Sequence, residues 1–216
     1  MARVIVCDVN ETLLDLGALA PHFKQAFGDG RVWQDWFGTV LLYSEVATLA
    51  GPYSDFSSIG RAALDMTATS RGVVLSASDR AQILQSLLTL PAQPDVRDGL
   101  QAMRDAGLRL VTLTNSAPAA VQQQLANAGL APFFEHSFSV DTVKRFKPAA
   151  EAYARWRSRL GFPWIDCVWS RRMRGTSLAR FARDAPPHSW PGQERFCTRS
   201  VLSRILQGRT SAASPN

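Results

Sequence analysis

Cysteine, histidine and long apolar runs are all scarce in this chain. Its three cysteines, Cys7, Cys167 and Cys197, are too few and too scattered to indicate a disulfide framework. No stretch approaches the roughly 18 apolar residues of a membrane span, so we expect no membrane association. The amino terminus leads into a predicted strand rather than a signal peptide, and the cytoplasm is the expected compartment. His136 has no partner at metal-ligand spacing, and we expect it at the surface.

The segment RVIVCDVNETLLD at residues 3–15 carries the strongest chemical signal. Its β-branched run at residues 4–6 is typical of a buried parallel strand, and Asp8 follows closely. Asp8 would therefore stand at the carboxyl end of a strand, where open α/β sheets bind ligands. A carboxylate there serves as a nucleophile, a metal ligand or a helix cap, and this segment alone does not decide among the three.

Two later segments favour a catalytic role for Asp8. Residues 108–114 (LRLVTLT) predict a second apolar strand that ends at Thr114 and is followed by an asparagine. Further on, Lys147 stands ahead of another predicted helix, with Tyr153 six residues after it. An acid, a hydroxyl and a lysine at successive strand ends supply a nucleophile, a hydrogen-bond donor and a counter-charge.

The segments DVNET, TLTNS and KPAAEAY resemble motifs I, II and III of the haloacid dehalogenase superfamily, and specifically its L-2-haloacid dehalogenase branch (type II). The similarity covers about residues 1 to 168. It implies no metal and no cofactor, because a lysine supplies the positive charge that magnesium supplies elsewhere in the superfamily. The resemblance implies catalytic roles for Asp8, Lys147, Thr12 and Tyr153, and substrate-binding roles for Val9, Asn10, Thr114 and Asn115.

The activity that this resemblance implies is that of an (S)-2-haloacid dehalogenase, acting on a short 2-haloalkanoic acid. Asp8 would attack the carbon that bears the halogen, halide would leave, and an aspartyl ester would form. Water would then hydrolyse the ester and release a 2-hydroxy acid of inverted configuration. A homodimer is compatible with the branch, and neither nucleic acid nor membrane is an expected partner.

Asn10 argues against the main alternative, a phosphatase of the same superfamily. Phosphatases that resemble this chain carry a second aspartate two residues after the nucleophile, which protonates the leaving alcohol. Asparagine cannot act as such a general acid. Halide leaves as an anion and needs no proton, so dehalogenation tolerates the change.

The first cap helix departs from the dehalogenase pattern. The branch usually has an arginine there that helps to hold halide and carboxylate, whereas this chain has Phe37 near the expected place. Arg31 is close in sequence but is expected to precede the helix. The preferred acid and leaving group therefore stay open. Phe37 and its neighbours Trp33 and Trp36 are expected in the helix core, the more common role of clustered aromatics.

The expected fold is an α/β core, a Rossmann-like parallel sheet, with an inserted helical cap. Residues 1–14 and 92–168 would form the core and residues 15–91 the cap. Gly51-Pro52 would separate two cap helices, and Ser76 would begin the last of them. Helices are expected at Ala20–Phe27, Val32–Leu49, Phe56–Thr67 and Ser78–Thr89 in the cap, and at Val96–Ala106 in the core.

The arginine-rich tail at residues 169–216 breaks this pattern. Residues 1–168 carry 15 Lys plus Arg against 16 Asp plus Glu, whereas the tail carries nine arginines, no lysine and only Asp184 and Glu194. A nucleic-acid-binding tail is one interpretation. Yet the tail lacks a fold signature, and a family member should here have a strand followed by an acidic motif IV.

A frameshift explains the tail better. The run LVAAHAWDVAGALRAG resembles motif IV and can be encoded by a GC-rich DNA sequence. When that DNA sequence is translated from its second base, it gives residues 169–184 of this chain without a mismatch. Codons for residues 194–211 can likewise be chosen so that the neighbouring reading frame encodes a segment that resembles the family's carboxyl end. We therefore infer a single-base shift near codon 168, arising in the organism or in the sequence record.

The consequence would be loss of the motif IV aspartate. That codon would fall across Gly175 and Thr176, so the chain has no carboxylate there. By resemblance, this acid helps to hold Lys147 and the hydrolytic water. The carboxyl-terminal strands would be missing or disrupted, the tail would pack poorly and turnover would be low or absent. A damaged dehalogenase is thus favoured over a phosphatase and over a non-catalytic basic remnant.

Overall fold

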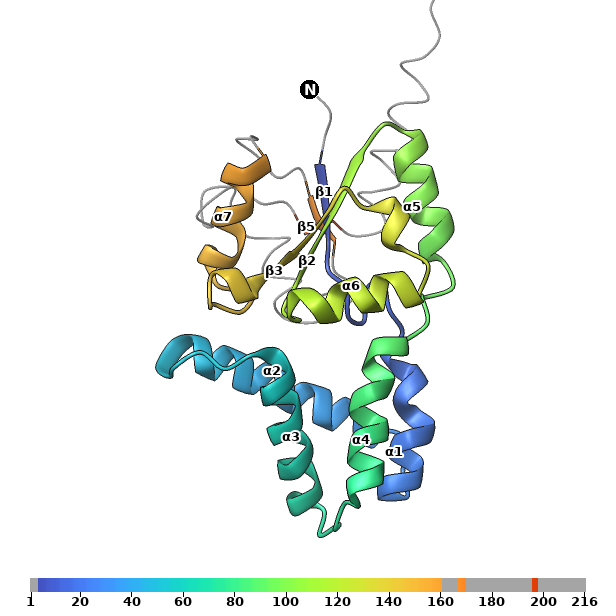
Figure 1. Cartoon of the computed structure of the whole chain (residues 1–216), viewed down its shortest axis with the longest axis vertical. Coiled ribbons are helices and arrows are strands. Elements are labelled where there is room, and N and C mark those ends of the chain that lie inside the picture. Colours follow the sequence, from blue (N-terminus) through green and yellow to red (C-terminus); the bar gives the residue numbers. More distant parts are fainter. Residues whose placement is uncertain (1–3, 161–166, 170–195, 198–216) are drawn as a thin grey trace, which may run out of the picture.

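The chain folds around a parallel β-sheet that is capped at one end by a group of helices (Figure 1). A computed structural model describes residues 4–160, 167–169 and 196–197. Within these residues the sheet has five strands, in the order β3-β2-β1-β4-β5, and neighbouring strands run parallel. They are β1 (Val4–Cys7), β2 (Arg109–Thr114), β3 (His136–Ser139), β4 (Cys167–Trp169) and β5 (Phe196–Cys197).

Strand β1 lies at the centre of the sheet, between β2 and β4. All of its residues are buried, as expected for an apolar, β-branched strand that is covered on both faces. Val6 lies opposite Val111 on β2 and Val168 on β4. The strands predicted at residues 4–6 and 108–114 and the α/β fold class are thereby confirmed.

The two strands on the carboxyl-terminal side are short. Strand β4 has three residues and β5 has two, compared with six in β2. The expectation of missing or disrupted carboxyl-terminal strands concerns residues that lie mostly outside the described ranges. The positions at which the motif IV aspartate would be encoded, Gly175 and Thr176, lie outside the described residues.

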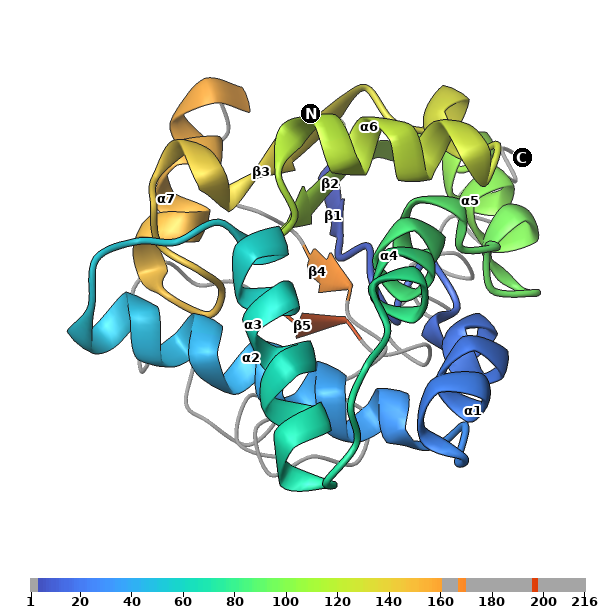
Figure 2. The same cartoon turned by 60° about the horizontal axis from the view of Figure 1, so that its bottom comes forward.

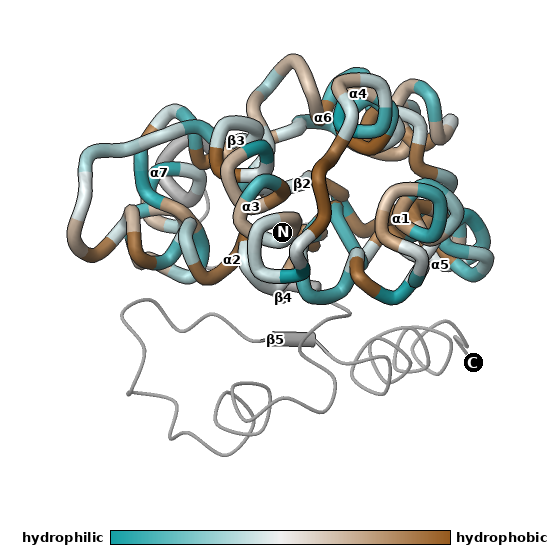
Figure 3. The backbone as a smooth tube through the Cα atoms, turned by 90° about the horizontal axis from the view of Figure 1, so that it is seen from below, coloured by the Kyte–Doolittle hydropathy of each residue, from teal (hydrophilic) through white to brown (hydrophobic). Residues whose placement is uncertain are grey.

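Helices cover both faces of the sheet. Helices α5 (Val96–Asp105) and α6 (Pro118–Asn127) lie on one face, and α7 (Ala150–Leu160) lies on the other (Figures 1 and 3). The predicted helix at residues 96–106 is confirmed, and its Leu100 and Met103 are buried as its amphipathic pattern requires.

The segment between β1 and α5 forms the helical cap that the spacing predicts. Ser76 begins α4 by accepting a 3.0 Å hydrogen bond from the Asp79 amide, and Asp55 caps α3 in the same way from the Ser58 amide. The last predicted helix ends earlier than expected, because residues 87–89 form a separate 3-10 turn, η2. The cap helices are η1 (Leu16–Leu19), α1 (Ala20–Phe27), α2 (Val32–Ala50), α3 (Phe56–Ser70) and α4 (Ala77–Ser86).

Aromatic side chains form the core of the cap. Trp36 and Phe37 on α2 are buried, as expected, whereas Trp33 is only partly buried. The Trp36 Nε1–H donates a 3.0 Å hydrogen bond to the Gly60 carbonyl of α3 and its ring lies 5.5 Å from that of Phe23 on α1. Three cap helices are therefore joined around one side chain. Within the described residues, no helix is both long and apolar enough to cross a membrane.

The cap leaves and rejoins the core through two adjacent segments. The Asp15 amide donates to the Pro91 carbonyl at 2.9 Å, and the Gln93 amide donates to the Leu13 carbonyl at 2.9 Å. These contacts lie at the positions where the core and cap are expected to divide. Figure 2 shows the cap helices in front of the strand ends, so the cap covers the carboxyl edge of the sheet.

Candidate active site

Asp8 is held at the carboxyl end of β1 by a tight turn. The Val9 carbonyl accepts hydrogen bonds from the amides of Leu13 (2.8 Å) and Leu14 (3.0 Å), which folds the chain back on itself. The turn returns Thr12 toward the strand end, where its hydroxyl donates to Asp8 Oδ2 at 3.0 Å. Val9 and Thr12 are fully buried, so the turn is a fixed part of the core.

Lys147 meets the other oxygen of the same carboxylate. Its Nζ lies 2.6 Å from Asp8 Oδ1, and both side chains are mostly buried, with 15% and 19% of their surface exposed. The ammonium also donates to the Leu113 carbonyl of β2 at 2.8 Å. The structure thus brings Lys147 to Asp8 and Thr12 from far along the sequence, and both oxygens of the Asp8 carboxylate are hydrogen-bonded.

Residues just after and at the end of β2 hold the backbone around this ion pair in place. Asn115 Oδ1 accepts a 3.0 Å hydrogen bond from the backbone amide of Lys147, and Thr114 Oγ1 accepts one of 3.1 Å from the Ser116 amide. Thr114 and Asn115 are both buried. These contacts fix the loops that carry Lys147 and Ser116.

Asn10 takes part in a chain of side-chain hydrogen bonds that the sequence did not predict. Its Nδ2 donates to Ser116 Oγ at 3.2 Å, and its Oδ1 accepts from Gln124 Nε2 at 3.3 Å. Gln124 Nε2 also donates to the Leu87 carbonyl of the cap at 2.8 Å. Ser116 follows the TLTN segment directly and could have been found from that motif, whereas no sequence signal marks Gln124.

Tyr153 lies on α7, the helix that follows Lys147. Its side chain is 5% exposed and belongs to the hydrophobic core.

The turn that precedes Lys147 contacts the cap. The Phe146 amide donates to Thr48 Oγ1 at 3.0 Å, and the Phe146 and Tyr53 rings stack with their centroids 5.1 Å apart. The Tyr53 hydroxyl donates to Asp141 Oδ1 at 2.7 Å, and burial together with this carboxylate raises the pKa of Tyr53.

Cys7 precedes the carboxylate but is not a second nucleophile. It is completely buried, and burial raises the pKa of its thiol far above the usual range, with a further increase from the negative charge of Asp8. A thiol in this environment stays protonated at neutral pH and packs as a small apolar side chain.

A cavity of about 190 Å³, which we call the cap–core cavity, lies between residues of the cap and residues of the core. Arg31 does not reach it: the residue precedes α2, as expected, and its exposed guanidinium pairs with Asp29 at 3.2 Å. Phe37 does line the cavity. The core contributes Asn10, Ser116 and Gln124 to the cavity wall, and the cap contributes Phe37, Phe56 and Arg61 among others.

Together these features define an α/β enzyme with a lysine-paired carboxylate at the end of a central strand, beneath a helical cap. Among the described residues, no group of three or more His, Cys, Asp or Glu side chains is placed to hold a metal ion. The chain belongs to the haloacid dehalogenase-like hydrolase family, whose model matches residues 2–169.

The known proteins to which this chain is similar include several (S)-2-haloacid dehalogenases. The (S)-2-haloacid dehalogenase of Xanthobacter autotrophicus is 34% identical over 194 residues, covering 85% of this chain and 76% of the relative. That of Pseudomonas sp. (strain YL) is 30% identical over 159 residues, covering 73% of this chain and 68% of the relative. The solved L-2-haloacid dehalogenase of X. autotrophicus with chloropropionic acid covalently bound aligns with a TM-score of 0.73 and 28% identity, over 100% of this chain and 85% of that chain.

Proposed function

We propose that this chain is an (S)-2-haloacid dehalogenase that removes halide from a short 2-haloalkanoic acid through an ester on Asp8. The observation that carries the proposal is the 2.6 Å contact between Lys147 Nζ and Asp8 Oδ1, with Thr12 donating to the second oxygen. This arrangement places a cation and a hydroxyl donor on the two oxygens of a mostly buried carboxylate, as a nucleophilic role for Asp8 requires. The names of the relatives support the same reaction.

The reaction has two steps. A carboxylate oxygen of Asp8 attacks the carbon that bears the halogen, and halide leaves with the bonding electron pair from the opposite side. Water then attacks the carbonyl carbon of the aspartyl ester, which restores Asp8 and releases a 2-hydroxy acid of inverted configuration. Lys147 offsets the negative charge that develops in the second step.

The remaining residues have supporting roles in this proposal. Thr12 orients the carboxylate, and Tyr153 supports the region of the lysine from α7. Asn115 positions Lys147 through its backbone amide. Val9, Asn10 and Thr114 shape the side of the site at which the substrate binds. The cap excludes water from the nucleophile while the ion attacks carbon.

The tail is proposed to impair the second step. The family match covers residues 2–169, so the arginine-rich tail lies outside it. Loss of the motif IV aspartate would weaken the hold on the hydrolytic water. Resequencing around codon 168 tests the frameshift, and a repaired chain should release halide many times faster than the 216-residue chain. Full turnover by the unrepaired chain would refute the impairment.

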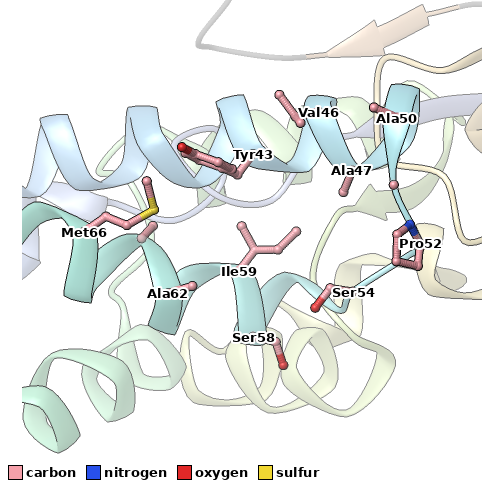
Figure 4. A pocket seen from close by; sticks show the side chains of 12 residues that line it. Tyr43, Val46, Ala47, Ala50, Pro52, Ser54, Ser58, Ile59, Ala62 and Met66 are labelled. Carbon is pink, nitrogen blue, oxygen red and sulfur yellow. The ribbon is translucent and has the colours of Figure 1, made fainter.

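A homodimer is proposed from an apolar groove between α2 and α3. Figure 4 shows Tyr43 and Ala47 on the side of α2 that faces Ile59 and Met66 of α3 across this groove. Leu49 near the end of α2 is 85% exposed. An exposed apolar patch of this kind marks a contact surface more often than a solvated face.

The proposed compartment is the cytoplasm, and the proposed partner is the small haloacid alone.

Halide release from (S)-2-chloropropionate tests the proposed activity directly. The proposal expects chloride and the (R)-2-hydroxy acid from the repaired chain, and no reaction of the (R)-haloacid. Release of phosphate from a generic ester in the presence of magnesium, without chloride release from any 2-haloacid, would instead identify a phosphatase.

A further inference from the structure

We infer that contacts between the cap and the segment ahead of Lys147 position this lysine against Asp8. These contacts, which we call the cap clasp, join two cap residues to three residues of the core: Thr48, Tyr53, Asp141, Lys144 and Phe146. Thr48 and Tyr53 are thereby assigned as positioning residues, because they act on the lysine through the backbone that carries it. The assignment rests on the proposed function, in which Lys147 offsets negative charge at Asp8.

Lys147 stands in a segment that belongs to no helix or strand. Residues 143–149 connect the 3-10 turn η4 (Val140–Thr142) to α7. Within this segment Lys144 has a φ of +54°, a left-handed conformation that is unfavourable for residues other than glycine. Surrounding contacts are needed to hold such a conformation. The position of Lys147 therefore depends on what the residues ahead of it touch.

Tyr53 forms one side of the clasp. It lies in the connection between α2 and α3, and its hydroxyl donates to Asp141 Oδ1 at 2.7 Å. Its ring stacks on that of Phe146, and Lys144 Nζ lies 4.7 Å from the centroid of the Tyr53 ring. Burial and the Asp141 carboxylate raise the pKa of Tyr53, so the hydroxyl keeps its proton and stays a donor at neutral pH. One cap side chain thus contacts three residues that precede Lys147.

Thr48 forms the other side, in the last turn of α2. Its Oγ1 accepts a 3.0 Å hydrogen bond from the Phe146 amide, and its backbone carbonyl accepts one from the Arg145 guanidinium. Carbonyls in the last turn of a helix have no partner within the helix, so this one is available to the segment. Figures 1 and 2 show this end of α2 next to the segment that leads into α7.

Two consecutive amides therefore join the cap and the core at this point. The Phe146 amide donates to the cap, and the Lys147 amide donates to Asn115 Oδ1 of the core at 3.0 Å. Adjacent Cα atoms are only about 3.8 Å apart, so a shift of the cap at Phe146 is passed to Lys147. The lysine Nζ reaches Asp8 Oδ1 from this backbone. Loosening the clasp should thus release Lys147 from its partner.

Competitive acetylation of the 216-residue chain tests the clasp without requiring turnover. The chain has three lysines, Lys24, Lys144 and Lys147, and Lys24 on α1 is exposed, so it serves as the internal reference. Trace acetic anhydride labels the folded chain, and a heavy-isotope reagent then labels the remaining amines in denaturant. Trypsin cleaves after Arg145, so mass spectrometry measures Lys144 and Lys147 in separate peptides. A lysine amine that is released from an ion pair reacts faster than one that is held.

Tyr53→Phe removes the hydroxyl and keeps the ring, and Thr48→Val removes the acceptor and keeps the side-chain shape. Each should raise the acetylation rate of Lys147 relative to Lys24 by roughly 3- to 20-fold, the effect of losing one hydrogen bond. Asn127→Ala is the matched control, because it removes a different cap–core hydrogen bond, from Asn127 Nδ2 to the Leu88 carbonyl at 2.8 Å. The ratio should stay unchanged in this control.

An unchanged ratio in both Tyr53→Phe and Thr48→Val would overturn the inference. An equal rise in Asn127→Ala would overturn it as well, because Lys147 would then respond to any loosening of the cap. Thermal unfolding checks that each variant is folded, and if one of the two clasp variants is not, the other decides the outcome.

Chloride release by the repaired chain separates positioning of the lysine from a general loss of structure. Tyr53→Phe should lower kcat for (S)-2-chloropropionate by about 3- to 20-fold and leave KM unchanged. A change confined to KM would contradict a role that acts through Lys147. Absence of chloride release from every form would refute the proposed function, whereas the clasp would then stand or fall on the acetylation ratio.

Discussion

The core wall and the cap wall of the cap–core cavity differ sharply in character. On the core wall, Asn10, Ser116 and Gln124 belong to a connected set of side-chain hydrogen bonds, and Asn10 follows Asp8 by two residues in the sequence. The cap side is mainly aromatic and aliphatic, with Arg61 as its charged member. In the proposed function, the strand ends supply the chemistry and the cap shapes the space in which the acid binds.

Asp8→Asn should give the largest loss of activity. The change keeps the shape of the side chain but removes the nucleophilic charge that Lys147 faces at 2.6 Å. We expect chloride release by the repaired chain to fall by at least about 10⁴-fold. A steady-state chloride assay with (S)-2-chloropropionate measures this, and a loss of less than tenfold would remove Asp8 from the mechanism.

Lys147→Met should cost less than loss of the nucleophile itself. The ammonium contacts Asp8 Oδ1 and the Leu113 carbonyl, so its removal leaves the carboxylate without its charged partner but with the Thr12 hydrogen bond. We expect kcat to fall by about 10²- to 10³-fold with a smaller change in KM. An effect confined to KM would assign the lysine to substrate binding rather than to the reaction.

Trp36→Phe should affect the cap without touching the ion pair. The substitution removes the donor to the Gly60 carbonyl, which would leave a buried acceptor without its partner. We expect the free energy of unfolding to fall by about 1–3 kcal/mol. Denaturant unfolding measures the change, and an unaltered midpoint would show that this hydrogen bond does not hold α2 to α3.

Asp55→Ala should give the smallest effect, about 1 kcal/mol of stability at neutral pH, because it removes the cap of α3. The hydrogen bonds from Ser58 lower the pKa of Asp55. Its stabilisation is therefore present above the carboxyl's ordinary pKa and is lost as pH falls through the lowered one. The difference between the two proteins should narrow in acid, and a constant difference down to low pH would contradict the role of the charge.

The sequence predicted the elements that have strong local signals. The cap helices have recognisable starts at Asp55 and Ser76 and a break at Gly51-Pro52, and the central strands are continuous apolar runs. Strand β3 was not predicted, because it is an edge strand of four residues whose first two, including the exposed His136, are polar.

The candidate site was predictable only in part, for a similar reason. Asp8, Thr12 and Lys147 stand in motifs whose order and spacing are informative. Gln124 and Arg61 line the cap–core cavity, and nothing in their local sequence indicates this. Gln124 is placed by its hydrogen bonds to Asn10 and to the Leu87 carbonyl of the cap.

Direct detection of the ester on Asp8 tests the central claim most closely. The 216-residue chain would be incubated with (S)-2-chloropropionate, digested, and analysed by mass spectrometry together with chloride release. Hydroxylamine treatment separates an aspartyl ester, which it cleaves, from alkylation of the adjacent Cys7, which it does not. We predict a hydroxylamine-labile propionate ester on the Asp8 peptide that is absent in Asp8→Asn. Chloride release with an unmodified Asp8 peptide, or a modification that hydroxylamine leaves in place, would contradict the account.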